Sequence, residues 1–214
     1  MKSADDIKSL LDRVLAQVKA DDASVNYGYR MRHNTRFGEN AITQNMGGES
    51  ESVSLTVAFG NRHGSASTTL VSDEAIAELV KRAEANAEAS PEDPEYMPPV
   101  GPQEYPETAK RYYDDITGLS PATLAEEVSH AIDVAKAESY KASGLFGYSY
   151  GISGMANSRG LFISDRGSNV SYSLTVHGPK GSGAANSCNE DPAKIDAKAI
   201  VAKAMATAKA AQGP

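Results

Sequence analysis

The chain has 214 residues, 40% of them hydrophobic, with 4 Phe, 10 Tyr and no Trp, so a sizeable core must be built largely from aliphatic side chains and tyrosine. Its 21 Lys and Arg against 28 Asp and Glu give a net charge of −7, which repels a phosphate backbone and disfavours direct nucleic-acid binding. Cys188 is the only cysteine, which excludes an intrachain disulfide; with no signal core or long apolar run, we expect a cytoplasmic protein that does not contact a membrane.

The first part of the chain is predicted to form a helix followed by strands. Residues 3–19 carry apolar side chains at helical spacing behind a serine that can cap the helix. From Ser24 the apolar positions alternate with polar ones, which predicts a half-buried strand. Residues 35–45 are a second extended stretch, which the Gly47-Gly48 pair is expected to end.

A further strand, turn, strand and helix are predicted next. Residues 52–59 alternate again, residues 60–61 are Gly-Asn and fit a hairpin turn, and residues 62–70 form the returning strand. A helix is predicted over residues 72–86, with a serine as its cap.

A connector rich in proline separates this half from the next. Residues 89–107 contain six prolines, which exclude a regular helix or a central strand because proline lacks the amide hydrogen. Ser120 and Pro121 then begin a third helix, predicted to run to about Ala142.

The second half repeats the first at an offset of about 119 residues. Ser-Leu-Thr-Val occurs at residues 54–57 and again at residues 173–176. Gly-Ser-Ala at residues 64–66 is matched by Gly-Ser-Gly at residues 181–183. Because order and spacing are both preserved, we favour a duplication over chance recurrence. The predicted division is a first half (1–88), a connector (89–119) and a second half (120–214).

The predicted fold class is α+β, with two layers. Each half reads as helix, strands, helix, and each strand has one apolar and one polar side, so we expect a largely antiparallel sheet of six to eight strands with helices on one face. The opposite face would carry polar rows such as Ser52, Ser54 and Thr56.

No catalytic or metal-binding constellation is recognised. The four histidines are too widely separated in sequence to form a helical ligand pair: His33, His63, His130 and His177. Ser149 lies in a Gly-x-Ser-x-Gly sequence, but strand alternation continues through it, so it is interpreted as a strand residue and not a nucleophile. Cys188 is interpreted as a packed thiol.

Four stretches resemble the first domain of the TldD/PmbA metallopeptidase family. Residues 35–45 are similar to an early family motif in which Arg-Phe precedes Asn and Gln, and residues 55–66 resemble the hairpin that follows. Residues 157–161 resemble an Asn-Ser-x-Gly signature, and residues 173–183 resemble the strand and glycine turn after it. The resemblance covers nearly all of the chain and depends on the order and distances of these stretches.

The resemblance implies the non-catalytic N-terminal half of a zinc-dependent peptidase. TldD-like members carry a His-Glu-x-x-x-His zinc motif in a C-terminal domain that is absent from this sequence; PmbA-like members lack the motif and act as partners of TldD-like ones. We therefore expect no cofactor in this chain and no activity of the chain alone. We also expect a homodimer or heterodimer with a TldD/PmbA-type subunit, and a tunnel for extended peptide.

The residues that the resemblance offers for substrate or interface contact are Arg36, Asn40, Asn157, Ser158 and Arg159. Turn formation is the competing interpretation, because Asn, Ser and Gly are good turn formers. Two other functions stay open: a peptide-binding or scaffold module that acts alone, and a protein partner of DNA gyrase, after the older family name, modulator of DNA gyrase.

Overall fold

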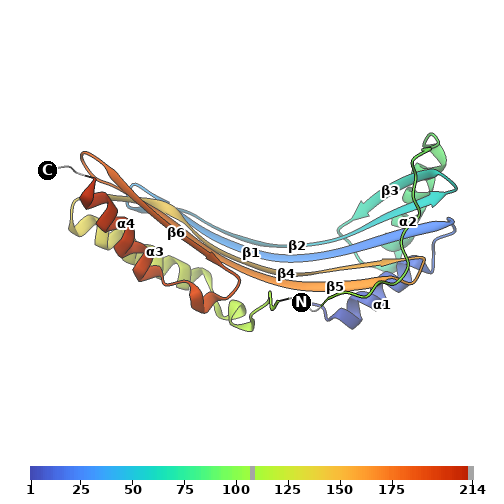
Figure 1. Cartoon of the computed structure of the whole chain (residues 1–214), viewed down its shortest axis with the longest axis horizontal. Helices are drawn as coiled ribbons and strands as arrows, with labels where there is room; N and C mark the ends of the chain where they lie inside the picture. Colours follow the sequence, from blue (N-terminus) through green and yellow to red (C-terminus); the bar gives the residue numbers. More distant parts are fainter. Residues whose placement is uncertain (107–108, 212–214) are drawn as a thin grey trace. The chain divides into compact units, whose positions relative to one another are not determined.

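The computed structural model describes residues 1–106 and 109–211, and its helices and strands form an α+β fold (Figure 1). In chain order the elements are α1 (Ala4–Leu15), β1 (Asp22–Gly38), β2 (Ala41–Phe59), β3 (Arg62–Thr68), α2 (Asp73–Ala89), η1 (Asp114–Gly118), α3 (Pro121–Ala137), β4 (Lys141–Asn157), β5 (Phe162–His177), β6 (Ser182–Asn189), η2 (Pro192–Lys194) and α4 (Ala197–Ala210). The strands form one antiparallel sheet in the order β3-β2-β1-β4-β5-β6. The predicted fold class and the helix–strands–helix plan of each half are confirmed.

The helix starts are set by local sequence, as predicted. The hydroxyl of Ser3 accepts a hydrogen bond from the amide of Asp6 at 3.1 Å, and the Asp6 carboxylate accepts one from the amide of Ser3 at 2.9 Å. Ser120 caps α3, which ends at Ala137 and not at Ala142. The longer prediction is wrong because Ser139 has a positive φ of 63°, which a right-handed helix cannot include.

The first hairpin turn lies elsewhere than predicted. Glu39 and Asn40 have φ values of 50° and 62°, which make the tight turn between β1 and β2. Residues 35–45 are therefore not one extended stretch, and the Gly47-Gly48 pair does not end a strand but lies inside β2. Asparagine adopts the left-handed conformation more readily than most residues other than glycine, which suits Asn40 to this turn.

The chain divides into two compact units, each assembled from three segments. Unit 1 comprises the described residues of Met1–Arg30, Glu49–Ala109 and Gly151–Arg166; unit 2 comprises those of Met31–Gly48, Lys110–Tyr150 and Gly167–Pro214. Each unit contains parts of both sequence halves, because β1, β2, β4 and β5 contribute residues to both units. The division at residues 88 and 120 describes the repeat along the chain and stays a prediction.

In each unit two helices pack against one side of the strands. The core of unit 1 joins Ile7 of α1 and Leu79 of α2 to Leu55 of β2, all fully buried. In unit 2 the core joins Leu124 of α3 and Ala204 of α4 to strand residues. The predicted polar rows are confirmed: Ser52, Ser54 and Thr56 are exposed, and they alternate with the buried Val53, Leu55 and Val57.

The internal repeat extends to the register of the outer hairpins. Val57 of β2 faces Gly64 of β3, and Val176 of β5 faces Gly183 of β6, 119 positions further along. A Cβ at Gly64 would lie 2.2 Å from a backbone nitrogen of α2, and one at Gly183 would lie 2.2 Å from a backbone oxygen of α4. The structural counterpart of Gly64 is therefore Gly183 and not Gly181, and both glycines let a helix approach its strand closely.

Candidate functional site

Three of the predicted contact residues form the turn between β4 and β5 in unit 1. Asn157 is buried, and its side-chain oxygen accepts hydrogen bonds from the amides of Arg159 at 3.0 Å and Leu161 at 3.1 Å. Its side-chain nitrogen donates to the carbonyl of Val100 at 2.8 Å. Asn157 thus closes the turn and binds the proline-rich connector.

Ser158 and Arg159 bind the start of β1. The Ser158 hydroxyl accepts from the amide of Ala23 at 3.0 Å, and the Ser158 amide donates to the Ala23 carbonyl at 2.9 Å. Arg159 donates from Nε to Oδ1 of Asp22 at 3.0 Å and from Nη2 to Oδ2 at 3.3 Å. Hydrogen bonding to Asp22 raises the pKa of Arg159 above its ordinary value, so the guanidinium stays charged and paired.

The connector is held at the same place by an aromatic residue. Tyr96 donates its hydroxyl proton to Asp22 at 3.5 Å and stacks on the ring of His63, with centroids 5.9 Å apart. Burial raises the pKa of Tyr96 above its ordinary value, which keeps the hydroxyl protonated. We call Asp22, Tyr96, Asn157 and Arg159 the connector clamp.

Asn40 makes the corresponding contacts in unit 2. Its amide donates to the carbonyl of Ala142 at 3.2 Å, and its side-chain oxygen accepts from the Ala142 amide at 2.7 Å. Its side-chain nitrogen donates to the carbonyl of Tyr140 at 2.8 Å. Ala142 follows Ala23 by 119 positions, so this bonding repeats that of Ser158 with Ala23.

Arg36 is the one predicted contact residue whose side chain has no hydrogen bond or ion pair with the rest of the described chain. It lies in β1 and is exposed, between the buried Thr35 and Phe37. Its carbonyl accepts a hydrogen bond from the Thr43 hydroxyl at 3.3 Å across the hairpin. The Arg36 guanidinium is therefore available to a partner.

Beside Arg36 lies an open strand edge, residues 41–48 of β2. All eight positions are exposed, including Ile42 at 39% and Met46 at 55%. The described pairing of β2 with β3 covers only Val53–Phe59, which leaves the outer edge of residues 41–48 without a neighbour from β3. An unpaired edge presents backbone N–H and C=O groups that can bind an extended chain.

A polar group of three residues, which we call the His33 cluster, anchors this edge: His33 and Thr35 are buried, and Asn45 is exposed. His33 Nε2 lies 2.5 Å from the side-chain oxygen of Asn45, which also accepts from the Thr35 hydroxyl at 3.0 Å. Because an amide oxygen can only accept, Nε2 must carry the proton. The His33 ring stacks on Tyr148 at 5.9 Å. A Cβ at Gly47 would lie 2.3 Å from His33 Nδ1, which explains the glycine in this strand.

The His33 cluster was missed by sequence reasoning, which weighed His33 only as a metal ligand. Among the described residues, no three His, Cys, Asp or Glu side chains gather to hold a metal ion. Ser149 lies within β4 and is buried, so its interpretation as a strand residue is confirmed. Cys188 lies in β6 and is exposed, so the prediction of a packed thiol is wrong. Its side chain lies on the polar side of the strand, where the side-chain nitrogen of Asn169 donates a hydrogen bond to Sγ at 3.0 Å.

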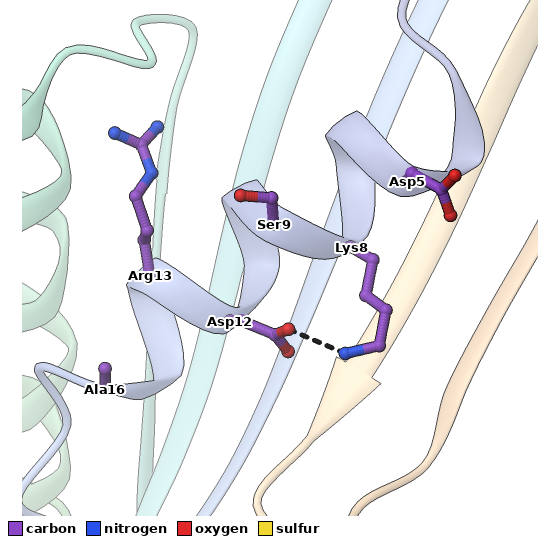
Figure 2. Close-up of a pocket in the computed structure, with 6 residues that line it drawn as sticks. All are labelled: Asp5, Lys8, Ser9, Asp12, Arg13 and Ala16. Atoms are coloured by element: carbon purple, nitrogen blue, oxygen red, sulfur yellow. Dashed lines mark hydrogen bonds and ion pairs between the residues drawn. The ribbon is translucent and has the colours of Figure 1, made fainter.

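Two of the hollows in the described surface lie beside helices, one in each unit. The one along α1 is lined mainly by polar and charged residues, and an ion pair of 2.6 Å joins Lys8 to Asp12 across it (Figure 2). Its lining residues are Asp5, Lys8, Ser9, Asp12, Arg13 and Ala16. Both charged groups are about half exposed, so this is a solvated helix face. The second hollow, a cavity of about 420 Å³, lies in unit 2 beside α3 and α4.

Across the described residues, no helix combines the length and apolar character needed to cross a lipid bilayer.

Comparison with known families gives two matches that together cover most of the chain. Residues 25–87 match the PmbA/TldA metallopeptidase domain 1, and residues 103–212 match the PmbA/TldA metallopeptidase central domain. No curated protein matches the chain.

Several solved structures have the same fold. TldE from Thermococcus kodakarensis superposes with a TM-score of 0.81 at 20% identity, over 97% of this chain and 47% of that one. A proposed modulator of a DNA gyrase from Thermotoga maritima gives 0.82 at 14% identity, over 95% and 48%. A third, a proposed modulator of DNA gyrase from Bacteroides thetaiotaomicron, gives 0.73 at 15%, over 93% and 47%. The chain thus spans about half the length of these solved relatives.

Proposed function

Since the chain belongs to the PmbA/TldD metallopeptidase family, we propose that it acts as the non-catalytic N-terminal half of a peptidase of this family. In this role it takes part in subunit pairing, as a homodimer or with a TldD/PmbA-type subunit, and helps to wall a path for extended peptides. Zinc and the hydrolytic step belong to the C-terminal domain of a TldD-like subunit.

The open edge formed by residues 41–48 is the observation that carries the peptide-guiding role. Backbone hydrogen bonds at a strand edge bind an extended chain without selecting its sequence. Exposed Ile42 and Met46 offer apolar contact, and Arg36 offers a charge on the neighbouring strand. The His33 cluster stabilises the edge strand, because Asn45 is bonded to two buried side chains of β1.

The experiment uses the 214-residue chain and a peptide without charged ends, acetyl-Thr-Val-Thr-Val-Thr-Val-amide. We expect the peptide to protect amides of residues 41–48 from hydrogen exchange, and the same peptide with alternate N-methylation to give no protection. The Met46→Lys variant should weaken binding by roughly tenfold, equivalent to about 1.4 kcal/mol, by placing a charge on the edge. The matched control is Leu70→Lys, at a residue that is 65% exposed and outside this edge.

Protection elsewhere, or equal protection by both peptides, would contradict the peptide-guiding role. Peptidase turnover and bound zinc in the purified chain would contradict the non-catalytic role. Peptide binding by a chain that pairs with no TldD/PmbA-type subunit would favour a binding module that acts alone.

A second candidate follows from two of the solved relatives, which are described as proposed modulators of DNA gyrase. With a net charge of −7 the chain has no electrostatic attraction to DNA, so a role of this kind would act through protein contact with gyrase. Capture of purified gyrase subunits by the chain, insensitive to added DNA, is the expected result of that function; absence of capture would contradict it.

A further inference from the structure

Two arginines of β1, Arg32 and Arg36, lie on the face of the sheet opposite to α3 and α4. Both are exposed, whereas His33, Thr35 and Phe37 are buried, and Phe37 belongs to the core that contains those helices. Because successive side chains of a strand point to opposite faces, both guanidiniums point away from that core, about 13 Å apart along the strand. We call this side of the sheet in unit 2 the arginine face.

The two guanidiniums have no carboxylate to pair with in this part of the sheet. The neighbours of β1 are β2 and β4, and residues 41–48 of β2 and 142–150 of β4 contain no Asp or Glu. At the turn between β1 and β2, Glu39 is already paired with Lys141 at 2.5 Å. No hydrogen bond or ion pair joins either guanidinium to the rest of the described chain. Each guanidinium is therefore available to a carboxylate, whose two oxygens match its planar fork.

β2 lies between these arginines and any chain bound at its outer edge, and it has a gap on their face. A Cβ at Gly47 would lie 2.3 Å from His33 Nδ1 and 3.3 Å from the carbonyl oxygen of Arg32, so Gly47 lies beside Arg32 and faces the buried side. Gly48 therefore faces the arginine side, where a Cβ would meet nothing within 4 Å. The next residue, Glu49, returns to the face of Gly47 by the same alternation. No side chain of residue 48 stands between Arg32 and the outer edge.

A chain added at this edge would lie two strand spacings from β1, about 10 Å away. Arginine and glutamate both have long side chains, and together they can span this distance where the intervening position is a glycine. A lysine at the same place would meet a like charge, and a neutral side chain would leave the guanidinium unpaired.

We propose that the edge formed by residues 41–48 selects extended peptides that carry an acidic side chain on the arginine face. Arg32 binds the carboxylate across Gly48, and Arg36 adds to the positive charge of the same face. The selection rests on the peptide-guiding role proposed above for this edge, and it adds a preference for charge to backbone bonds that do not select a sequence.

Two peptides of nearly equal shape test the selection on the 214-residue chain: acetyl-Thr-Val-Glu-Val-Thr-Val-amide and its Gln counterpart. Affinity is measured from the protection of residues 41–48 against hydrogen exchange during a titration. We expect the Glu peptide to bind about three- to fivefold more tightly at low ionic strength, as for an exposed ion pair, and this advantage to shrink at high salt. Equal binding would overturn the selection alone; protection by neither peptide would contradict the peptide-guiding role and the selection with it.

Matched variants locate the charge. Arg32→Gln should bring the ratio of the two affinities to about one, and Arg36→Gln should lower it. Arg13→Gln removes the same net charge from α1, where Arg13 pairs with Asp73, and should keep the ratio of the unsubstituted chain. An unchanged ratio in Arg32→Gln would overturn the assignment. Arg32→Glu should bind acetyl-Thr-Val-Lys-Val-Thr-Val-amide more tightly than the unsubstituted chain does; a preference that stays with the Glu peptide would also overturn it.

Two other anions are separated by the same variants. Single-stranded oligo(dT) is expected not to bind, because the chain has a net charge of −7; binding that Arg32→Gln abolishes would assign the arginines to a nucleic acid and overturn the proposal. The Gln peptide with a free C-terminal carboxylate should bind less tightly than the Glu peptide. The reverse order would assign the arginines to a chain end and overturn the choice of an acidic side chain.

Discussion

Asp22 and Arg159 form a two-pronged ion pair, with Nε–Oδ1 and Nη2–Oδ2 distances of 3.0 and 3.3 Å. The pair joins the start of β1 to the turn after β4, beside the bonds between Ser158 and Ala23. In unit 2 the turn before β2 is joined to the start of β4 by the two hydrogen bonds between Asn40 and Ala142. The hairpin turn of each repeat therefore binds the first strand of the other repeat. This exchange explains why each unit contains parts of both repeats.

Arg159→Lys is expected to loosen the connector. Lysine keeps the charge but cannot make two parallel hydrogen bonds to one carboxylate. We expect faster hydrogen exchange over residues 93–102 and a Tm lower by roughly 2–4 °C. The control is Arg62→Lys, because Arg62 makes a single exposed contact of 3.3 Å with Glu92. Equal effects of the two substitutions would show that the two-pronged geometry contributes nothing.

Gly64→Ala and Gly183→Ala are expected to be equally damaging. At each position an added Cβ would lie 2.2 Å from helix backbone, so the helix must move from its strand. We expect a loss of about 3 kcal/mol or more in the free energy of unfolding, measured by urea denaturation. Gly48→Ala is the control, because a Cβ there would meet nothing within 4 Å. Unequal losses at the two positions would contradict their structural equivalence.

Sequence alone predicted those parts of the fold that depend on neighbours along the chain. The hydroxyls of Ser3 and Ser120 accept hydrogen bonds from amides three residues further along, so the local sequence alone identifies both helix caps. The turn at Asn40 escaped prediction because its conformation is secured by Ala142, a residue about a hundred positions later. The role of Gly47 escaped prediction for the same reason. A glycine is needed there because of the His33 ring on the neighbouring strand β1.

The candidate site was harder to predict than the fold. Asn157 and Arg159 were chosen for a motif resemblance, and the structure engages both in turn and clamp bonds, so their role in substrate contact stays a prediction. The cavity beside α3 and α4 left no motif in the sequence. Its lining comes from residues between Leu119 and Lys198, and only folding brings them together.

Gly47→Ala should destabilise the chain less than Gly64→Ala does. The obstacle at Gly47 is the ring of His33, with Nδ1 2.3 Å from the added Cβ, and a side chain can move where a helix backbone cannot. We expect a loss of about 1–2 kcal/mol in a urea titration. The His33→Ala/Gly47→Ala double variant should recover part of it, seen as a coupling energy in a double-mutant cycle. Strict additivity would show that the ring is not the obstacle.

Tyr172→Phe is expected to stabilise the chain. The substitution removes a fully buried hydroxyl that has no hydrogen-bond partner in the described structure, and the ring that stacks on Phe146 is kept. We expect a gain of about 1 kcal/mol in the free energy of unfolding at neutral pH. Tyr150→Phe, at a partly buried strand position, is the comparison. A destabilised Tyr172→Phe variant would mean that the hydroxyl has a partner in solution.

The stability of unit 1 should fall at both extremes of pH through Tyr27 and Glu51. Burial, and then the hydrogen bond to Glu51, raise the pKa of Tyr27 above its ordinary value near 10. The unfolded chain then loses the phenolic proton first, so this contribution is complete below about pH 10 and is lost as pH rises beyond it.

The contribution of Glu51 to stability depends on pH in the opposite direction. Burial alone would raise the pKa of Glu51, but hydrogen bonds from Lys2 and Tyr27 outweigh it and leave the pKa below its ordinary value. This contribution is therefore present above about pH 4.3 and is lost as pH falls through the folded-state pKa. Urea midpoints measured from pH 3 to 11 should decline at both ends, and Tyr27→Phe should flatten both limbs. Unchanged limbs in Tyr27→Phe would assign the pH dependence to other groups.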